Sequence, residues 1–185
     1  MKRVSKYWHR RKNSLYLHAV RQLMEALAPH AESLIDVGSS GCPYLDWYGW
    51  IPHRTSLDLR TPYLSADINS IKADFLLWEK DRSYDVGTCL QVLEHIDRAD
   101  LFARKLLDTS GLVIVSVPYK WKAKPGNSHV HDPIDEAKMR DWFQRDPNYS
   151  IVIQEVTTAA RRLVNVYERG SSRVWKSLRQ RSSVD

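Results

Sequence analysis

The stretch SLIDVGSSG, residues 33–41, limits the fold more than any other part of the sequence. We interpret it as a short buried strand that carries one carboxylate, Asp36, and that ends in a turn of small residues, Gly38 to Gly41. In open α/β sheets, ligands bind beyond the carboxyl ends of the strands, where the first strand meets its helix. The turn is therefore the first candidate for a ligand site.

The rest of the chain alternates between strand-like and helical patterns. Strands that are apolar on both faces and separated by amphipathic helices predict a parallel sheet covered on each side. Two late strand-like runs, 149–156 and 161–169, predict an antiparallel hairpin at one edge. We therefore predict an α/β fold with a Rossmann-like doubly wound sheet. The other strand-like runs are 33–38, 54–59, 84–90 and 111–119, and the helical ones are 14–27, 98–107 and roughly 135–145.

Length and composition indicate one globular domain in a reducing compartment. A chain of 185 residues suits a single core. No apolar run approaches the roughly 18 residues of a membrane span, and the basic start MKRVSKYWHRRKN lacks the apolar region of a secretory signal. Two cysteines, Cys42 and Cys89, form neither a disulfide framework nor a metal quartet. We expect a cytoplasmic protein, and its oligomeric state stays open.

The positive charge is concentrated at the two ends of the chain. The net charge is +6, and residues 1–30 hold seven Lys and Arg against one acid, whereas residues 161–185 hold seven against two. The stretch between them is mildly acidic. Basic ends favour contact with nucleic acid, with an anionic membrane surface or with a phosphorylated substrate. Their other interpretation is that they only keep the protein in solution.

A second carboxylate indicates which ligand the turn holds. Asp58 ends the next strand, 20 residues after Gly38, where an acid can bind both hydroxyls of a ribose. Pro43 stands where a dinucleotide-binding turn needs its third glycine or alanine. Asp36 would also repel a pyrophosphate. We therefore expect a nucleoside cofactor with a cationic amino-acid end.

The ordered motifs LIDVGSSGCPYL, SLDL, KADF, YDVGTCLQVLEHI and GLVIVSVPY resemble those of class I S-adenosylmethionine-dependent methyltransferases. The resemblance covers roughly residues 15–168 and is greatest to the small-molecule branch with the ubiquinone-type O-methyltransferases. It implies the seven-stranded fold of that family and S-adenosyl-L-methionine as cofactor. We expect one methyltransferase domain at 1–168, with a basic helix or lid at 1–30, and a basic tail at 169–185.

The resemblance also implies which residues hold the cofactor. The methionine end would meet Asp36 and the turn, the ribose would meet Asp58 and Leu59, and Asp74 would accept the adenine amino group with Phe75 beside the ring. Gln91 and Val92 would line the methionine or adenosine side. In the turn, Ser40 and Cys42 replace the second and third glycines of the family. The cofactor-binding set is Asp36, Gly38, Ser39, Gly41, Asp58, Leu59, Asp74, Phe75, Gln91 and Val92.

Three histidines are the candidates for catalysis. Methyl transfer to a hydroxyl requires alignment of the acceptor and removal of one proton, for which histidine suits neutral pH. His95 follows the fourth motif, and His129 and His131 lie in the segment after the fifth. The alternatives stay open: His95 with Glu94 organises a helix start, and the later pair belongs to a loop.

Other activities compete with a small-molecule or glycan O-methyltransferase. The chain also resembles RNA 2′-O-methyltransferases of the small-RNA-end type. In those enzymes an E-x-x-E-H motif and a later histidine bind magnesium or manganese. Gln91 replaces the first of those carboxylates, so no metal ligand is assigned. SVPY, residues 116–119, lacks the asparagine of enzymes that methylate amide or exocyclic nitrogens. A non-catalytic binding module with an altered turn is the third alternative.

The remaining aromatic segments bear on the acceptor. Tyr119 and Trp121 form either a wall of the acceptor pocket or strand-end packing. We expect 47–50 to extend a helix after the turn and to pack against the N-terminal helix. The tail at 169–185 is expected to be partly disordered, with Val174, Trp175 and Leu178 available for contact with a membrane surface or a partner.

Overall fold

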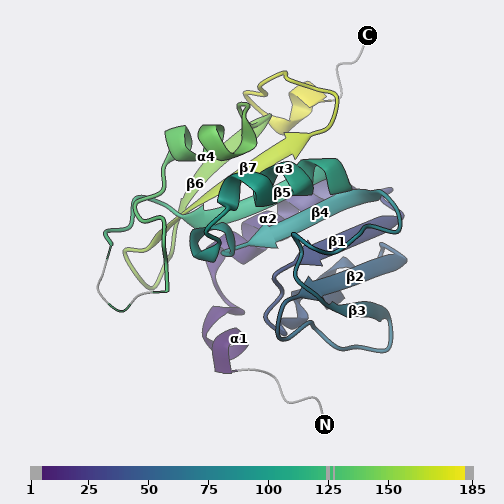
Figure 1. Cartoon of the computed structure of the whole chain (residues 1–185). Helices are drawn as coiled ribbons and strands as arrows, with labels where there is room; N and C mark the ends of the chain where they lie inside the picture. The colour runs from purple at the N-terminus through teal and green to yellow at the C-terminus, as the bar shows by residue number, and fades with distance from the viewer. Residues whose placement is uncertain (1–5, 124–125, 127, 182–185) are drawn as a thin grey trace.

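The computed structural model describes residues 6–123, 126 and 128–181. One seven-stranded sheet with the order β3-β2-β1-β4-β5-β7-β6 forms its centre (Figure 1). β1 to β5 run parallel, and β7 runs antiparallel to β5 and β6. The predicted α/β sheet with its antiparallel edge hairpin is confirmed. The strands are β1 (Ser33–Val37), β2 (His53–Asp58), β3 (Ile68–Lys72), β4 (Tyr84–Leu90), β5 (Ser110–Pro118), β6 (Tyr149–Gln154) and β7 (Arg161–Glu168).

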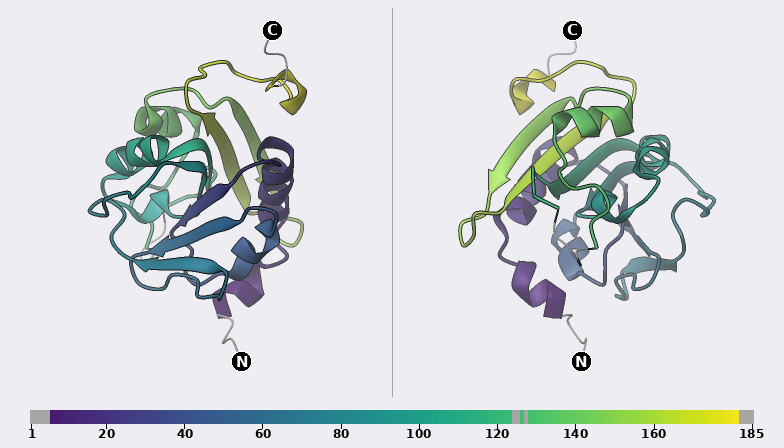
Figure 2. Two further views of the ribbon diagram at one scale, coloured as in Figure 1. Left: turned by 90° about the vertical axis from the view of Figure 1, so that its right-hand side faces the viewer. Right: turned by 60° about the vertical axis from the view of Figure 1, so that its left-hand side comes forward.

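Helices cover both faces of the sheet (Figure 2). Successive residues of a strand point to opposite faces, so Leu34 of β1 packs in the core cluster of α2 (Leu15–Leu27) and Ile35 packs in that of α3 and α4. The apolar residues of α2 recur with helical spacing, which buries one side of this helix. The second face carries α3 (Ala99–Thr109) and α4 (Glu136–Phe143), and α1 (Lys6–Arg11) precedes α2.

The turn after β1 is not followed by the expected α-helix. The segment forms a single 3₁₀ helix, η1 (Pro43–Tyr48), because β2 already begins at His53 and leaves no room for more turns. The expected packing of its aromatic residues is confirmed. The Trp47 ring contacts Trp8 of α1 and stacks on His18 of α2, at centroid distances of 5.5 and 5.3 Å.

The C-terminal tail is ordered over its described part, which corrects the expectation of disorder for residues 169–181. Trp175 is only 4% exposed and packs in the core cluster of α2. Its backbone N–H donates to the carbonyl of Asn148, and Arg181 of η3 (Leu178–Arg181) pairs with Glu168 at 2.8 Å. Burial of Trp175 removes it from any partner surface. No described helix has the length and apolar character needed to cross a membrane.

Candidate functional site

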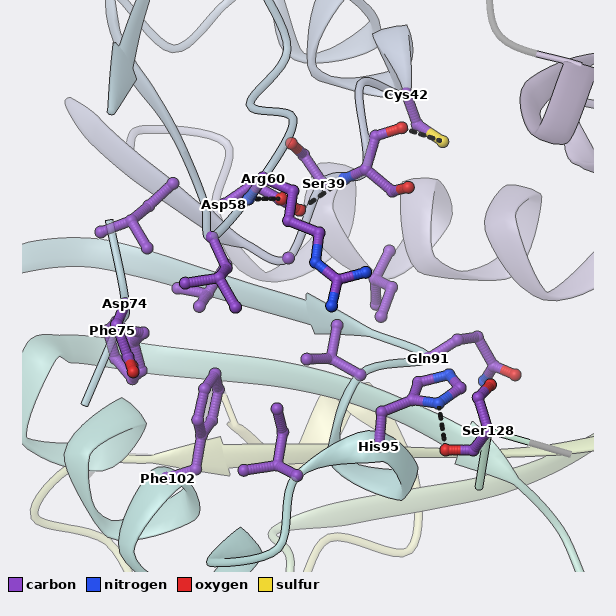
Figure 3. Close-up of a pocket in the computed structure, with 18 of the residues that line it drawn as sticks. Ser39, Cys42, Asp58, Arg60, Asp74, Phe75, Gln91, His95, Phe102 and Ser128 are labelled. Atoms are coloured by element: carbon purple, nitrogen blue, oxygen red, sulfur yellow. Dashed lines mark hydrogen bonds between the residues drawn. The ribbon is translucent and has the colours of Figure 1, made fainter. Parts of the chain in front are cut away.

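A cavity of about 750 Å³ opens at the carboxyl ends of β1, β2 and β4. α1 borders it with Trp8 and Arg11. The close-up in Figure 3 shows residues of the β1 and β2 ends on one side and His95 with Gln91 on the other. The predicted residues that line this cavity are Gly38, Ser39, Asp58, Leu59, Asp74, Phe75, Gln91, Val92 and His95.

The glycine turn lies against the end of β4. Gly38 has φ +87°, and a Cβ there would lie 2.4 Å from a methyl carbon of Val92. Glycine at this position allows the turn and the β4 end to approach closely. Gly41 also has a positive φ, as does Ser40 at 49°, but Gly41 does not line the cavity. Ser40 thus adopts a left-handed backbone itself, in a turn where Gly38 and Gly41 also have positive φ.

Asp58 joins the turn to the end of β2. Its Oδ2 accepts a hydrogen bond from the Ser40 amide at 2.9 Å, and its Oδ1 accepts from the Arg60 and Thr61 amides at 2.8 Å. The predicted ribose carboxylate is therefore held by three backbone donors while it faces the cavity. Figure 3 shows the Arg60 guanidinium extending from this segment into the cavity.

Asp36, which is predicted to meet the methionine end of the cofactor, lies behind the cavity wall in this structure. Asp36 is fully buried and does not line the cavity. It accepts hydrogen bonds from Tyr44 Oη at 2.7 Å and from Thr88 Oγ1 at 2.6 Å. Burial raises the pKa of Asp36 to about 7 despite these donors. The Tyr44 ring, which the sequence analysis did not single out, stands at the cavity wall in its place.

The predicted adenine end lies after β3. Asp74 accepts a hydrogen bond from the Leu76 amide at 2.9 Å, which orders the start of the loop. Phe75 is buried, with its ring 4.7 Å from that of Phe102 in α3. A carboxylate beside a pair of aromatic rings suits a flat heterocycle with an amino group.

At the opposite end of the cavity, the lining residue His95 forms a cluster with Glu94 and His129. Each residue offers one possible metal-binding atom, a carboxylate oxygen or an imidazole nitrogen, and these three atoms all lie within 4.8 Å of one another. Glu94 belongs to η2 (Leu93–His95) and its side chain is 1% exposed. Burial raises the pKa of Glu94 to about 8, and Oε2 has no hydrogen-bond partner among the described residues. Burying a carboxylate oxygen without a hydrogen-bond partner costs free energy unless a bound ligand interacts with that oxygen.

The two histidines of the cluster are oriented by neighbours. His95 Nδ1 lies 3.0 Å from the Ser128 carbonyl oxygen, and His129 Nδ1 lies 2.8 Å from Asp132 Oδ2. Each Nδ1–H therefore donates, which leaves both Nε2 lone pairs available. Burial lowers the pKa of His95, so its ring is neutral at pH 7 and can accept a proton. The cluster offers a base, and equally a set of three ligands.

The cluster fits a divalent cation. Two imidazoles, each fixed through its second nitrogen, and one buried carboxylate form an oriented N₂O ligand set. The Gln91 amide is held by a hydrogen bond that its Nε2 donates to Ser116 Oγ at 3.1 Å. The sequence analysis assigned no metal ligand on account of Gln91, whereas the structure brings the other three groups together.

His131, the third histidine predicted as a catalytic candidate, does not join this cluster. Its Nε2 lies 2.8 Å from the Ile96 carbonyl oxygen, and its ring packs on Trp142 of α4. His131 thus ties the loop to α4, away from the cavity. Trp121 stacks on His129 at 5.8 Å, so the aromatic segment after β5 does border the cluster. The lining residues that sequence reasoning missed include Trp8, Arg11, Tyr16, Tyr44, Arg60, Phe102 and Ser128.

Known protein structures of the same architecture are numerous. No family model matches the sequence, and no curated protein matches it. The methyltransferase domain of a bacterial CtHen1 is 16% identical with a TM-score of 0.59, over 83% of this chain and 97% of that one. The N-methyltransferase NodS of Bradyrhizobium japonicum, in complex with S-adenosyl-L-homocysteine, is 11% identical with a TM-score of 0.64, over 88% and 91%.

A third structure is the 1,6-didemethyltoxoflavin-N1-methyltransferase of Burkholderia thailandensis, with its toxoflavin precursor and S-adenosylhomocysteine bound. It is 10% identical with a TM-score of 0.65, over 86% of this chain and 80% of that one. These likenesses cover 83–88% of the chain. The chain therefore has the fold of the class I S-adenosylmethionine-dependent methyltransferases.

Proposed function

We propose that the protein is an S-adenosylmethionine-dependent methyltransferase that methylates a hydroxyl oxygen of a small-molecule or glycan acceptor. The observation that carries this proposal is the cavity itself, with Asp58 and Asp74 at one end and the base His95 at the other. Such a cavity matches a nucleoside cofactor bound beyond the strand ends, with the acceptor opposite. The buried thiols Cys42 and Cys89 agree with the reducing cytoplasm expected for it.

The reaction needs little from the protein beyond alignment and a proton acceptor. The acceptor oxygen attacks the methyl carbon, the bond from that carbon to sulfur breaks, and S-adenosylhomocysteine leaves. The hydroxyl proton passes to Nε2 of His95, whose Nδ1–H stays bonded to the Ser128 carbonyl. Tyr44 and the Gly38 turn hold the methionine end, and Asp58 faces the ribose.

Calorimetric titration with S-adenosylhomocysteine tests this proposal first. We expect micromolar binding by the wild type, and about tenfold weaker binding by Asp58→Asn, which loses one charge-assisted hydrogen bond to the ribose. Glu79→Gln is the matched control, because Glu79 lies outside the cavity lining. The absence of binding by the wild type would contradict the enzyme and would favour a non-catalytic binding module.

A second candidate is a metal-dependent RNA 2′-O-methyltransferase, and the Glu94, His95 and His129 cluster is what favours it. A bound divalent cation would supply a Lewis acid that lowers the pKa of a coordinated hydroxyl. Glu94 and both Nε2 atoms would hold it, and Asp132 would keep the His129 ring oriented. The basic N-terminal segment agrees with a nucleic-acid acceptor.

Two readouts separate the candidates. Electron paramagnetic resonance of added Mn²⁺ measures binding to the cluster directly, without any acceptor. Methylation of a short RNA that ends in a vicinal diol, compared with the same RNA that ends in a 2′-deoxynucleotide, then reports the acceptor atom. Saturable Mn²⁺ binding with diol-dependent methylation supports the metal enzyme. Methylation of small hydroxylated acceptors in the presence of a chelator supports the first candidate.

A further inference from the structure

Arg162 of β7 is a buried cation beside the acceptor end of the cavity. Arg162 is only 6% exposed, and its Nε has no hydrogen-bond partner among the described residues. Nη1 donates to the Arg161 carbonyl at 3.2 Å. Arg162 forms no ion pair with any described carboxylate. A buried charge without an ion pair is costly, so an anion bound nearby would be attracted to it.

Aromatic rings connect Arg162 to the Glu94, His95 and His129 cluster. Its guanidinium lies 4.4 Å from the Trp121 ring centroid and 5.7 Å from that of Tyr16. The other neighbour of Trp121 is His129, and Tyr16 itself lines the cavity. The stack therefore holds the guanidinium plane in one orientation, next to the place where the acceptor is expected.

Arg11 of α1 brings a second guanidinium to the same end. Its side chain lines the cavity together with His95 and Ser128. The two arginines are close enough to interact: burial is the main cause of the lowered pKa of Arg162, and the positive charge of Arg11 adds to it. The carboxylates that act on Arg162 are Glu155 and Glu94. Glu155 is engaged through Oε2 with the Leu15 amide at 2.8 Å, and Glu94 belongs to the cluster.

We propose that Arg11 and Arg162 form an anion subsite that binds a phosphate ester of the acceptor, next to the hydroxyl that is methylated. The inference rests on the proposed methyltransferase function and names the class of its substrate. Arg11 contacts the anion from the cavity wall, and Arg162 supplies a second, fixed charge behind Tyr16. The Arg11 guanidinium can bind an anion in the cavity directly, and a phosphate, with its larger negative charge, gains more than a carboxylate from the nearby Arg162 charge.

Calorimetric titration with inorganic phosphate, at constant ionic strength and with a chelator present, tests the subsite. The chelator prevents phosphate from binding through a metal at the cluster. The titration is done on the protein alone and on the protein saturated with S-adenosylhomocysteine. We expect saturable binding by the wild type, and about tenfold weaker binding by Arg11→Gln and by Arg162→Lys. Arg98→Gln, the matched control, removes a cavity-lining arginine that pairs with Asp100 and should bind phosphate like the wild type.

The outcomes are distinct from those of the proposed function. Failure of S-adenosylhomocysteine to bind would overturn the methyltransferase, while the titration of the protein alone still tests the anion subsite. No saturable phosphate binding, or an equal loss in Arg98→Gln and Arg11→Gln, would overturn the subsite. Competition by both methyl phosphate and dimethyl phosphate would assign a phosphodiester acceptor, competition by methyl phosphate alone a monoester, and competition by neither would refute the inference.

Discussion

Two buried carboxylates, Asp36 under the glycine turn and Glu94 beside the histidines, differ in how their oxygens are satisfied. Burial raises both pKa values, to about 7 and about 8. Asp36 accepts hydrogen bonds from Tyr44 and Thr88, one to each oxygen. Glu94 leaves Oε2 without a partner among the described residues. The first carboxylate supports the turn from behind, whereas the second is incomplete without a ligand or a proton.

The two ends of the cavity differ in the same way as these two carboxylates. At the cofactor end, three backbone amides of the turn and the loop fix the orientation of Asp58, so the binding surface is preformed. At the acceptor end, the orphaned Glu94 oxygen and the two open Nε2 atoms await a partner. We therefore expect the preorganised cofactor end to bind the cofactor, and the groups without hydrogen-bond partners at the acceptor end to take part in the reaction or to bind a metal.

The largest effect is expected for Gly38→Ala, which would break the preformed end. A Cβ at Gly38 would lie 2.4 Å from a Val92 methyl carbon. The turn would also hold the alanine in a left-handed backbone conformation, at φ +87°. The combined strain and overpacking of about 3 kcal/mol should weaken S-adenosylhomocysteine binding at least about 100-fold, as measured by calorimetry. In the double variant with Val92→Ala, part of the affinity should return. Wild-type affinity in Gly38→Ala would show that the turn does not shape the cofactor site.

The next largest effect is expected for Glu94→Gln at the incomplete end. The substitution removes the only anionic ligand of the cluster, and Mn²⁺ affinity should fall at least about 100-fold, the upper range for loss of a supporting partner. Asp36→Asn makes the same chemical change at the satisfied carboxylate and should leave Mn²⁺ affinity unaltered. Equal losses in the two variants would mean that the two carboxylates do not differ in role.

A smaller effect is expected for Asp132→Asn, which changes the partner of His129. The asparagine still reaches Nδ1 but lacks the charge that favours the Nδ1–H form, so Mn²⁺ affinity should fall about 10-fold. Electron paramagnetic resonance titration measures it. An unchanged affinity would indicate that His129 is oriented mainly by its stack on Trp121.

A different quantity, the pH dependence of stability, also distinguishes the two carboxylates. Because the folded-state pKa values of Asp36 and Glu94 lie above their ordinary values of 3.8 and 4.5, the folded state binds more protons than the unfolded state between these limits. The free energy of unfolding should therefore fall as pH rises, by up to about 1.4 kcal/mol per pH unit for each carboxylate. Glu94 extends this fall to about pH 8, Asp36 to about pH 7.

Urea unfolding with a chelator present measures this dependence as the difference between the wild type and each variant. Glu94→Gln should remove the part of the fall that reaches the higher pH, and Asp36→Asn the part that ends near neutrality. The difference isolates each carboxylate from His95, whose lowered pKa acts in the opposite direction. A difference that does not change with pH would refute the raised pKa values.

Much of the site could be predicted because it lies at strand ends. Asp58 and Asp74 follow β2 and β3 directly, and parallel strands deliver their carboxyl ends to one edge of the sheet. Strand alternation also carried a signal for Asp36 that was not used. Asp36 shares a face with Leu34, which packs under α2 rather than toward the cavity. The helix expected after the turn failed because the residues before β2 are too few for it.

The sequence by itself determined every strand except β3, the glycine turn and the acids at the strand ends, because these depend on spacing along the chain. Only the tertiary structure decided which histidine meets Glu94. His95 and Ser128 are 33 positions apart, and His129 and His131 differ by two positions in one loop, where no periodicity assigns a side chain to a face. Packing of the loop against η2, α4 and Trp121 settles that choice. Likewise, the tertiary structure decided that Trp175 of the tail is buried in the core, because burial of a large apolar ring outweighs the polar character of its neighbours in the sequence.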